Sequence, residues 1–157
     1  MNPMQLRPTI AEDVPGILKL ISGIYAEYDC VLDAENEERH LLEPGAYFRP
    51  GGGEFWVVED GGDILATVAV ILHGDTGELK SLYVHPRLRR QGWGRRLTDL
   101  AMERARAQGK SRMILWSDTR FTDAHRLYRN MGFRETGIRE LKDSNNTVEY
   151  GFELSLV

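Results

Sequence analysis

The sequence contains a single cysteine among 157 residues, Cys30, which excludes an internal disulfide and favours a reducing, cytoplasmic compartment. No segment approaches the roughly 18 consecutive apolar residues that a membrane-spanning helix requires. The first residues also lack the apolar stretch of a signal peptide, because Glu12, Asp13 and Lys19 interrupt the segment after Thr9. We therefore expect no membrane partner.

Internal repeats, low-complexity tracts and long linkers are missing as well. Apolar residues make up 41% of the chain and charged residues 28%, a balance typical of a folded globular protein. A chain of this length can bury a core without disulfides or a metal ion. We interpret residues 1–157 as a single domain and expect no metal site.

A strong positive charge is missing too: the net charge is −4, which argues against a nucleic-acid partner. The charges are nevertheless unevenly spread. One short segment is basic, with Arg87, Arg89, Arg90, Arg95 and Arg96. An earlier segment is acidic, with Glu27, Asp29, Asp33, Glu35, Glu37 and Glu38. This asymmetry indicates sites for charged ligands rather than a particular fold.

Hydrophobic periodicity and turn residues predict seven strands and four helices. The expected strands are residues 5–7, 55–59, 64–72, 78–84, 112–117, 133–141 and 147–156. The expected helices are residues 13–28, 34–42, 94–108 and 122–131. The order is β-α-α-β-β-β-α-β-α-β-β. Hairpin connections favour antiparallel pairs and the β-α-β crossovers favour a parallel pair, so we predict an α/β (α+β) fold with a single mixed, mostly antiparallel sheet flanked by helices.

The segment from Val84 to Arg95 is the most informative one, because a strand runs through a glycine-containing loop into a helix. Backbone amides at such a helix start bind anions, and arginines add charge and forked donors. The loop lacks the lysine of a P-loop, and Leu97 replaces the third glycine of a dinucleotide fingerprint. The pattern favours a pyrophosphate ligand, with an ordinary turn beside solvated arginines as the alternative.

Two motifs at the expected separation resemble the GNAT acetyltransferase superfamily. Arg89-Arg90-Gln91-Gly92-Trp93-Gly94 is similar to that family's [QR]-x-x-G-x-[GA] loop. The segment from Ala124 to Phe133 is similar to its A-x-x-L-Y-x-x-x-G-F pattern. The resemblance covers nearly the whole chain and implies a GNAT fold with acetyl-CoA as co-substrate. It also implies an N-acetyltransferase that moves an acetyl group to a primary amine by direct attack.

The resemblance further implies which residues hold the coenzyme. The loop residues Arg90, Gln91, Gly92, Trp93, Gly94 and Arg95 would bind the pyrophosphate, with Arg89 opening the motif. The backbone of Leu82, Tyr83 and Val84 would pair with the pantetheine arm. The amide of Val84 would then polarise the thioester carbonyl, where charge develops in the transition state.

Tyr128 matches the family tyrosine that donates a proton to the leaving thiolate. Its alternative is a plain core residue, because it shares a helical stripe with Leu127 and Met131. Glu78 is a candidate base, since period-two alternation places it on the same strand face as Val84. A solvated carboxylate is its alternative, and Asp118 or water is a second possible base.

The acceptor amine is expected to contact Tyr25, Tyr28, Asp29 and Asp118. The acidic segment would suit a small, cationic acceptor, although a solvated helix face explains the same charges. The competing function is a catalytically silent domain that binds acyl-CoA and regulates a partner. Exposed sheet edges are compatible with a homodimer.

Overall fold

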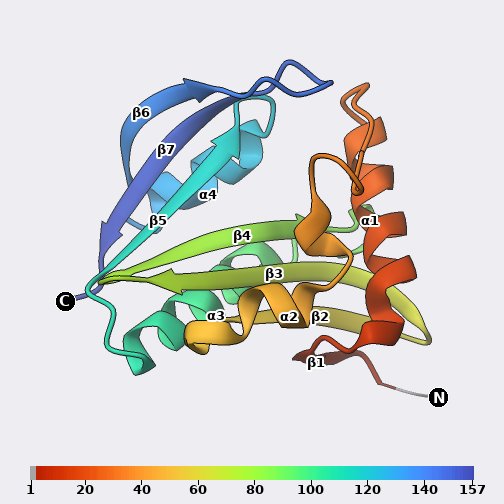
Figure 1. The fold of residues 1–157 in the computed structure, drawn as a ribbon, viewed down its shortest axis with the longest axis horizontal. Coiled ribbons are helices and arrows are strands. Elements are labelled where there is room, and N and C mark those ends of the chain that lie inside the picture. Colours follow the sequence, from red (N-terminus) through yellow and green to blue (C-terminus); the bar gives the residue numbers. More distant parts are fainter. Residues whose placement is uncertain (1–2) are drawn as a thin grey trace.

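The chain folds around one seven-stranded sheet with the strand order β1-β2-β3-β4-β5-β7-β6 (Figure 1). The computed structural model describes residues 3–157. The strands are β1 (Gln5–Pro8), β2 (Glu54–Asp60), β3 (Asp63–His73), β4 (Thr76–Val84), β5 (Arg112–Asp118), β6 (Arg134–Glu140) and β7 (Val148–Ser155). The β4–β5 pair is parallel and the other five neighbouring pairs are antiparallel, which confirms the predicted mixed sheet.

Helices cover both faces of this sheet. They are α1 (Val14–Ala26), α2 (Pro44–Phe48), α3 (Trp93–Ala107) and α4 (Thr122–Asn130). Figure 1 shows α1 and α2 in front of the sheet and α3 behind it. The order of strands and helices is the predicted one. Within the described residues no helix combines the length and hydropathy needed to cross a bilayer.

The two sheet faces bury two separate apolar clusters. Ile17, Ile21 and Ile24 of α1 pack with Phe48 and Phe55 on one face. Leu97, Ala101 and Ala105 of α3 pack with strand residues such as Val68 and Val70 on the other. Each of the Val, Leu, Ile and Phe side chains stabilises the fold by about 1.5–3 kcal/mol when fully buried. The helical periodicity of the sequence therefore marked the correct faces of α1 and α3.

The expected helix over residues 34–42 is wrong. Residues 34–37 form a turn in which Asp33 Oδ1 accepts from the Asn36 amide at 3.2 Å, and a short 3₁₀ segment covers Arg39–Leu41. The second helix begins instead at Pro44, whose fixed φ suits a first helical turn and whose missing N–H is not needed there. The first helix also ends earlier than expected, at Ala26 rather than residue 28.

The hairpin that Asp60-Gly61-Gly62-Asp63 predicts is present between β2 and β3, with a turn of two residues. Both Gly61 and Gly62 have positive φ, at 58° and 91°, which matches the right-handed twist of the flanking strands. The sheet ends in β1 on one side and β6 on the other. Every residue of β6 is exposed, so an open edge compatible with a second copy exists, and the homodimer stays a prediction.

Candidate active site

A cavity of roughly 310 Å³ lies where β4 and β5 separate. The two strands pair over four positions and their pairing ends at Leu79 and Leu115. Beyond that point both strands continue, to Val84 and Asp118, and Figure 1 shows them diverging. The cavity is lined by the diverging ends, including Ser81, Leu82 and Tyr83 of β4 and Ser117 and Asp118 of β5. The divergence therefore leaves backbone groups of β4 open to a ligand.

A bulge at Ser81 reverses the alternation of side chains along β4. Ser81 has a φ of +54°, and the register against β3 shifts between Thr67 and Ala69. Glu78 pairs with Ile71, whereas Val84 pairs with Ala66. Because directly paired residues share a face and the faces alternate along β3, Glu78 and Val84 lie on opposite faces. The expectation that they share one face is therefore wrong.

The Val84 amide points into the gap between β4 and β5. The amide of the next residue, His85, donates to Leu65 O at 2.8 Å, while Val84 itself lies opposite Ala66. In an antiparallel ladder this pattern makes Val84 a non-hydrogen-bonded position, whose N–H and C=O face away from β3. The Val84 carbonyl accepts from Arg89 Nε at 3.2 Å, which is consistent with that direction. A backbone N–H that β3 does not use is thus available at this position.

The loop between β4 and α3 presents a row of unpaired amides. Arg90 and Gly92 have φ values of +62° and +81°, and Gly92 caps α3 without a side-chain partner. In the part of the chain that the structure describes, no amide from Arg90 to Arg95 donates to another group; Arg96, whose amide reaches Gly92 O at 3.0 Å, begins the helical ladder. Unpaired amides at the positive end of a helix dipole form an anion-binding site.

Some side chains of this loop contact other parts of the protein, and others are exposed to solvent. Arg89 forms a bidentate ion pair with Glu27 at 2.7 and 2.8 Å, and its hydrogen bonds hold the pKa of that carboxyl below its ordinary value. Gln91 Nε2 donates to Arg87 O at 2.9 Å. Trp93 packs against the apolar core beneath the loop. Arg90 and Arg95 are exposed, which leaves both guanidinium groups accessible to an anion.

A coenzyme A pyrophosphate fits the loop on these observations. A Cβ built on Gly92 meets nothing within 4 Å, so the space above the amides is open. A Cβ on Gly94 would lie 3.1 Å from Leu127 Cδ2, so this glycine permits α3 and α4 to approach closely. The two glycines of the motif therefore differ in their surroundings: Gly92 faces open space, whereas Gly94 lies against α4.

Tyr128 is both a core residue and a cavity residue. It is 4% exposed and packs at an angle against Phe133 and Phe152, with ring centroids 5.7 and 5.6 Å away. It also lines the cavity, and burial raises the pKa of its hydroxyl, which therefore stays protonated at neutral pH. The core and site interpretations of Tyr128 are not exclusive, because the ring fills the core while the residue borders the cavity.

Of the expected acceptor residues, the structure brings three to the cavity. Tyr25, Tyr28 and Asp118 line it, whereas Asp29 is exposed and does not. Asp118 accepts from Arg120 Nη1 at 2.9 Å and from the Arg120 amide at 2.9 Å. Glu78 also lines the cavity, with His73 Nε2 at 3.4 Å and Lys80 Nζ at 3.8 Å from its carboxylate.

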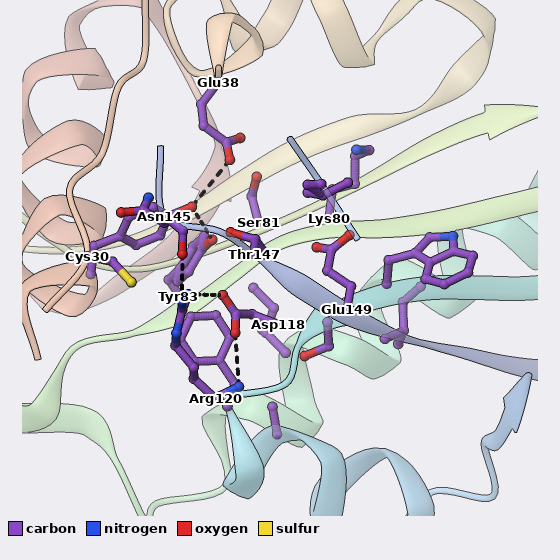
Figure 2. A pocket seen from close by; sticks show the side chains of 18 of the residues that line it. Cys30, Glu38, Lys80, Ser81, Tyr83, Asp118, Arg120, Asn145, Thr147 and Glu149 are labelled. Carbon is purple, nitrogen blue, oxygen red and sulfur yellow. Dashed lines mark hydrogen bonds and ion pairs between the residues drawn. The ribbon is translucent and has the colours of Figure 1, made fainter. Parts of the chain in front are cut away.

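Sequence reasoning missed several charged residues of the cavity. Figure 2 shows Glu38 on one side, the predicted Asp118 with Arg120 and Glu149 on the other, and Ser81 and Tyr83 between them. Glu38 lay inside the acidic segment but without a sign that it points inward, and Glu149 lay in a strand with no motif. Only the alternation of side chains along β7 could have indicated Glu149, because it lies on the opposite sheet face from its apolar neighbours Val148 and Tyr150.

The loop between β6 and β7 lines part of the cavity and contacts the loop after α1. Asn145 binds the backbone of Val31 at both polar atoms, accepting from its N–H at 3.0 Å and donating to its C=O at 2.8 Å. Ser144 donates to Glu37 through its amide and its hydroxyl, at 2.8 and 3.0 Å. We call these contacts the latch. They join the loop after α1 to the β6–β7 loop across the cavity, and both loops contribute lining residues.

Comparisons with known proteins agree with this geometry. Residues 20–133 match the family model described as "Acetyltransferase (GNAT) family". The uncharacterized N-acetyltransferase YjgM of Escherichia coli (strain K12) is 29% identical over 138 residues, which cover 84% of this chain and 82% of that protein. The amino-acid acetyltransferase of Azotobacter vinelandii is 34% identical over 140 residues, 87% of this chain but 29% of that enzyme, so the chain spans under a third of its length.

Solved structures confirm the fold. A GNAT-family acetyltransferase from Staphylococcus aureus Mu50 superposes with a TM-score of 0.86 at 19% identity, covering 99% of this chain and all of that one. An acetyltransferase from Salmonella typhimurium, yncA, solved with acetyl-CoA, has a TM-score of 0.72 at 21% identity, covering 99% and 95%. The family match over residues 20–133, on a fold with an open β4 edge and a free-amide loop, establishes that this chain belongs to the GNAT family of acetyltransferases, which use acetyl-CoA.

Proposed function

We propose that this protein acetylates a small, cationic primary amine, with acetyl-CoA as the donor. The charge of the cavity is the observation that carries this proposal. Seven carboxylates line the cavity, from Asp33, Glu37, Glu38, Glu78, Asp118, Asp143 and Glu149. Three cations oppose them, from Lys80, Arg120 and Arg139. An excess of four negative charges in a partly enclosed space favours a positively charged ligand.

His40 does not offset this excess at neutral pH. Burial, with a smaller effect from Lys80, lowers the pKa of its imidazole to about 4. The acidic segment noted in the sequence contributes Asp33, Glu37 and Glu38 to the cavity. Its other members lie elsewhere, with Glu27 bound to Arg89.

A small acceptor is favoured by the latch. The contacts of Asn145 and Ser144 with the loop after α1 join two loops that line the cavity and so restrict access between them. A folded protein surface would have to break these contacts to reach the cavity, whereas a free amine would not. The relatives include an amino-acid acetyltransferase and N-acetylaspartate synthetase, both named for small molecules.

In the proposed reaction the bound acetyl-CoA supplies an activated acetyl group. The amides from Arg90 to Arg95 hold its pyrophosphate, and the open edge of β4 at Leu82, Tyr83 and Val84 orients its arm. The Val84 N–H stabilises negative charge on the carbonyl oxygen. Tyr128 donates its hydroxyl proton to the leaving sulfur.

The test is thiol release from acetyl-CoA with polyamines, aminoglycosides, amino acids and lysine peptides as acceptors. We expect the highest kcat/KM for small polycationic amines and a fall in kcat/KM with added salt, because the Debye length shrinks from about 10 Å at 0.1 M to 3 Å at 1 M. A preference for neutral or acidic amines would contradict the cationic acceptor. Acetyl-CoA binding without release for any amine would favour the regulatory domain.

A further inference from the structure

Three of the seven cavity carboxylates form hydrogen bonds within or between the loops that line the cavity. Asp33, Glu37 and Asp143 each accept hydrogen bonds from side chains of these loops. Four carboxylates remain as proton acceptors for a ligand, those of Glu38, Glu78, Asp118 and Glu149.

Cations hold three of these four. Asp118 is bound by the Arg120 guanidinium at 2.9 Å. Glu149 receives Arg139 Nε at 2.8 Å and Nη2 at 2.7 Å. Glu78 lies between His73 and Lys80. These cations occupy part of the space around each carboxylate, so fewer of its lone pairs remain for a ligand.

Glu38 has different neighbours, a tyrosine hydroxyl and an imidazole that is uncharged at neutral pH. Tyr25 Oη donates to Glu38 Oε1 at 3.3 Å, and His40 Nε2 lies 3.4 Å from Oε2. Tyr25 has a single hydroxyl proton, so the 3.4 Å contact between the hydroxyls of Tyr25 and Tyr83 requires Tyr83 to donate. A directed chain therefore runs from Tyr83 on β4 through Tyr25 on α1 to the Glu38 carboxylate.

The surroundings of Glu38 make it more basic than an exposed glutamate. Burial raises the pKa of its carboxyl, and Glu149 on β7 and Glu37 on its own loop act in the same direction. The Tyr25 hydroxyl on α1 and Lys80 on β4 oppose this shift. The combined effect is a pKa above the ordinary glutamate value, closer to neutral pH.

We propose that Glu38 is the base that takes the proton from the acceptor ammonium, with Tyr25 and Tyr83 as the residues that position its carboxylate. This role rests on the amine acetylation proposed above. It follows from three observations: Glu38 lines the cavity, no arginine or lysine pairs with it in residues 3–157, and a hydrogen-bond chain links it to β4 beside Val84.

The proton balance of the step is complete with these groups. The acceptor R–NH₃⁺ gives one proton to the Glu38 carboxylate, which becomes a neutral carboxyl group, and R–NH₂ remains. The amine nitrogen forms a bond to the acetyl carbon as the carbon–sulfur bond breaks. A second proton leaves the nitrogen and replaces the one that Tyr128 gives to the sulfur. Glu38 then releases its proton to water, so that one proton is liberated per turnover.

Glu38→Gln is the decisive variant, because glutamine keeps an oxygen that accepts from Tyr25 and loses the basic carboxylate. We expect kcat to fall by about 10²-fold at pH 7, within the range typical for a lost general base. The part of the pH–rate profile in which the rate falls as Glu38 becomes protonated, called the acidic limb below, should disappear. The rate of the variant should instead follow the fraction of neutral amine and approach that of the parent at high pH. The thermal shift with acetyl-CoA should stay unchanged, which reports an intact fold and coenzyme site.

Two matched variants separate this role from others. Glu35→Gln makes the same charge change on the same loop, at an exposed residue outside the cavity, and should leave the profile unchanged. Glu78→Gln removes the base expected on β4 and should retain the acidic limb. Loss of that limb in Glu78→Gln with retention in Glu38→Gln would overturn the proposal.

A rise in KM alone for Glu38→Gln, with kcat and the limb retained, would also overturn it, because Glu38 would then only bind charge. Absence of turnover by the unsubstituted protein would instead contradict the proposed acetylation itself. The two failures are therefore distinguishable.

Discussion

Substitution of Gly92 tests the coenzyme loop most directly. Gly92 has a φ of +81°, and its Cβ position is empty to 4 Å. In the free protein, Gly92→Ala therefore adds no clash and costs only the left-handed backbone strain, about 1–2 kcal/mol. For a domain of this size that loss lowers Tm by about 2–8 °C.

The second effect of Gly92→Ala appears only with ligand. Acetyl-CoA at a hundredfold excess over its Kd should stabilise the parent by about 2.7 kcal/mol, or about 5–11 °C. A methyl group above the loop amides occupies the space through which the phosphates approach, so the variant should lose most of this shift. The assay is a melting curve with and without acetyl-CoA.

Gly109 supplies the matched control. It follows α3 at the opposite end, has a φ of +77°, and its Cβ position is likewise empty. Gly109→Ala should lower the Tm of the free protein by a similar amount and keep the full acetyl-CoA shift. Equal shifts in Gly92→Ala and Gly109→Ala would refute the assignment of the loop amides to the phosphates.

Three further predictions concern the cavity and the latch. Tyr128→Phe should keep the acetyl-CoA shift and lower kcat by about 10²-fold, and an unchanged kcat would leave Tyr128 with its packing role alone. Asn145→Ala removes both hydrogen bonds to Val31 and should lower stability by about 1 kcal/mol while raising KM for the amine; an unchanged KM would mean that the latch does not shape the cavity. The pKa of His40 is lowered to about 4 in the folded state, whereas an unfolded histidine has a pKa near 6.5. The folded protein therefore has its full free energy of unfolding above pH 6.5 and loses part of it as pH falls toward 4, because the unfolded state takes up the proton first. His40→Gln should therefore lose about 3 kcal/mol less than the parent between pH 7 and 4 in urea unfolding, and equal losses would contradict this.

Local patterns predicted the parts of the fold that depend on local interactions. The Gly61-Gly62 turn, the apolar stripe of α1 and the loop around Gly92 each depend on residues close in sequence, and each was located correctly. The helix after α1 was misplaced because an acidic segment with helical propensity preceded Pro44, and the proline set the true start. Propensity is a weak guide where a proline in the first helical turn sets the start of a helix.

Two features of the site were beyond local reasoning. No residue near Ser81 in the sequence predicts its φ of +54°. The bulge accompanies a shift in the pairing of β4 with β3, and that shift depends on the partner strand. Asn145 and Val31 are 114 residues apart, and their contact exists only because the β6–β7 loop reaches the loop after α1. The inward direction of Glu38 depends on that same arrangement, so no sequence period could reveal it.

The short pairing of β4 with β5 divides the molecule into two mechanical units. Four residue pairs, from Thr76–Arg112 to Leu79–Leu115, are the whole ladder between β1–β4 and β5–β7. Beyond them the latch and the contacts around α3 and α4 keep the units together. A ligand bound between the two units would contact both and hold them together. Its binding should therefore slow amide hydrogen exchange in β5, β6 and β7 more than in the β2–β3 hairpin, which lies within one unit.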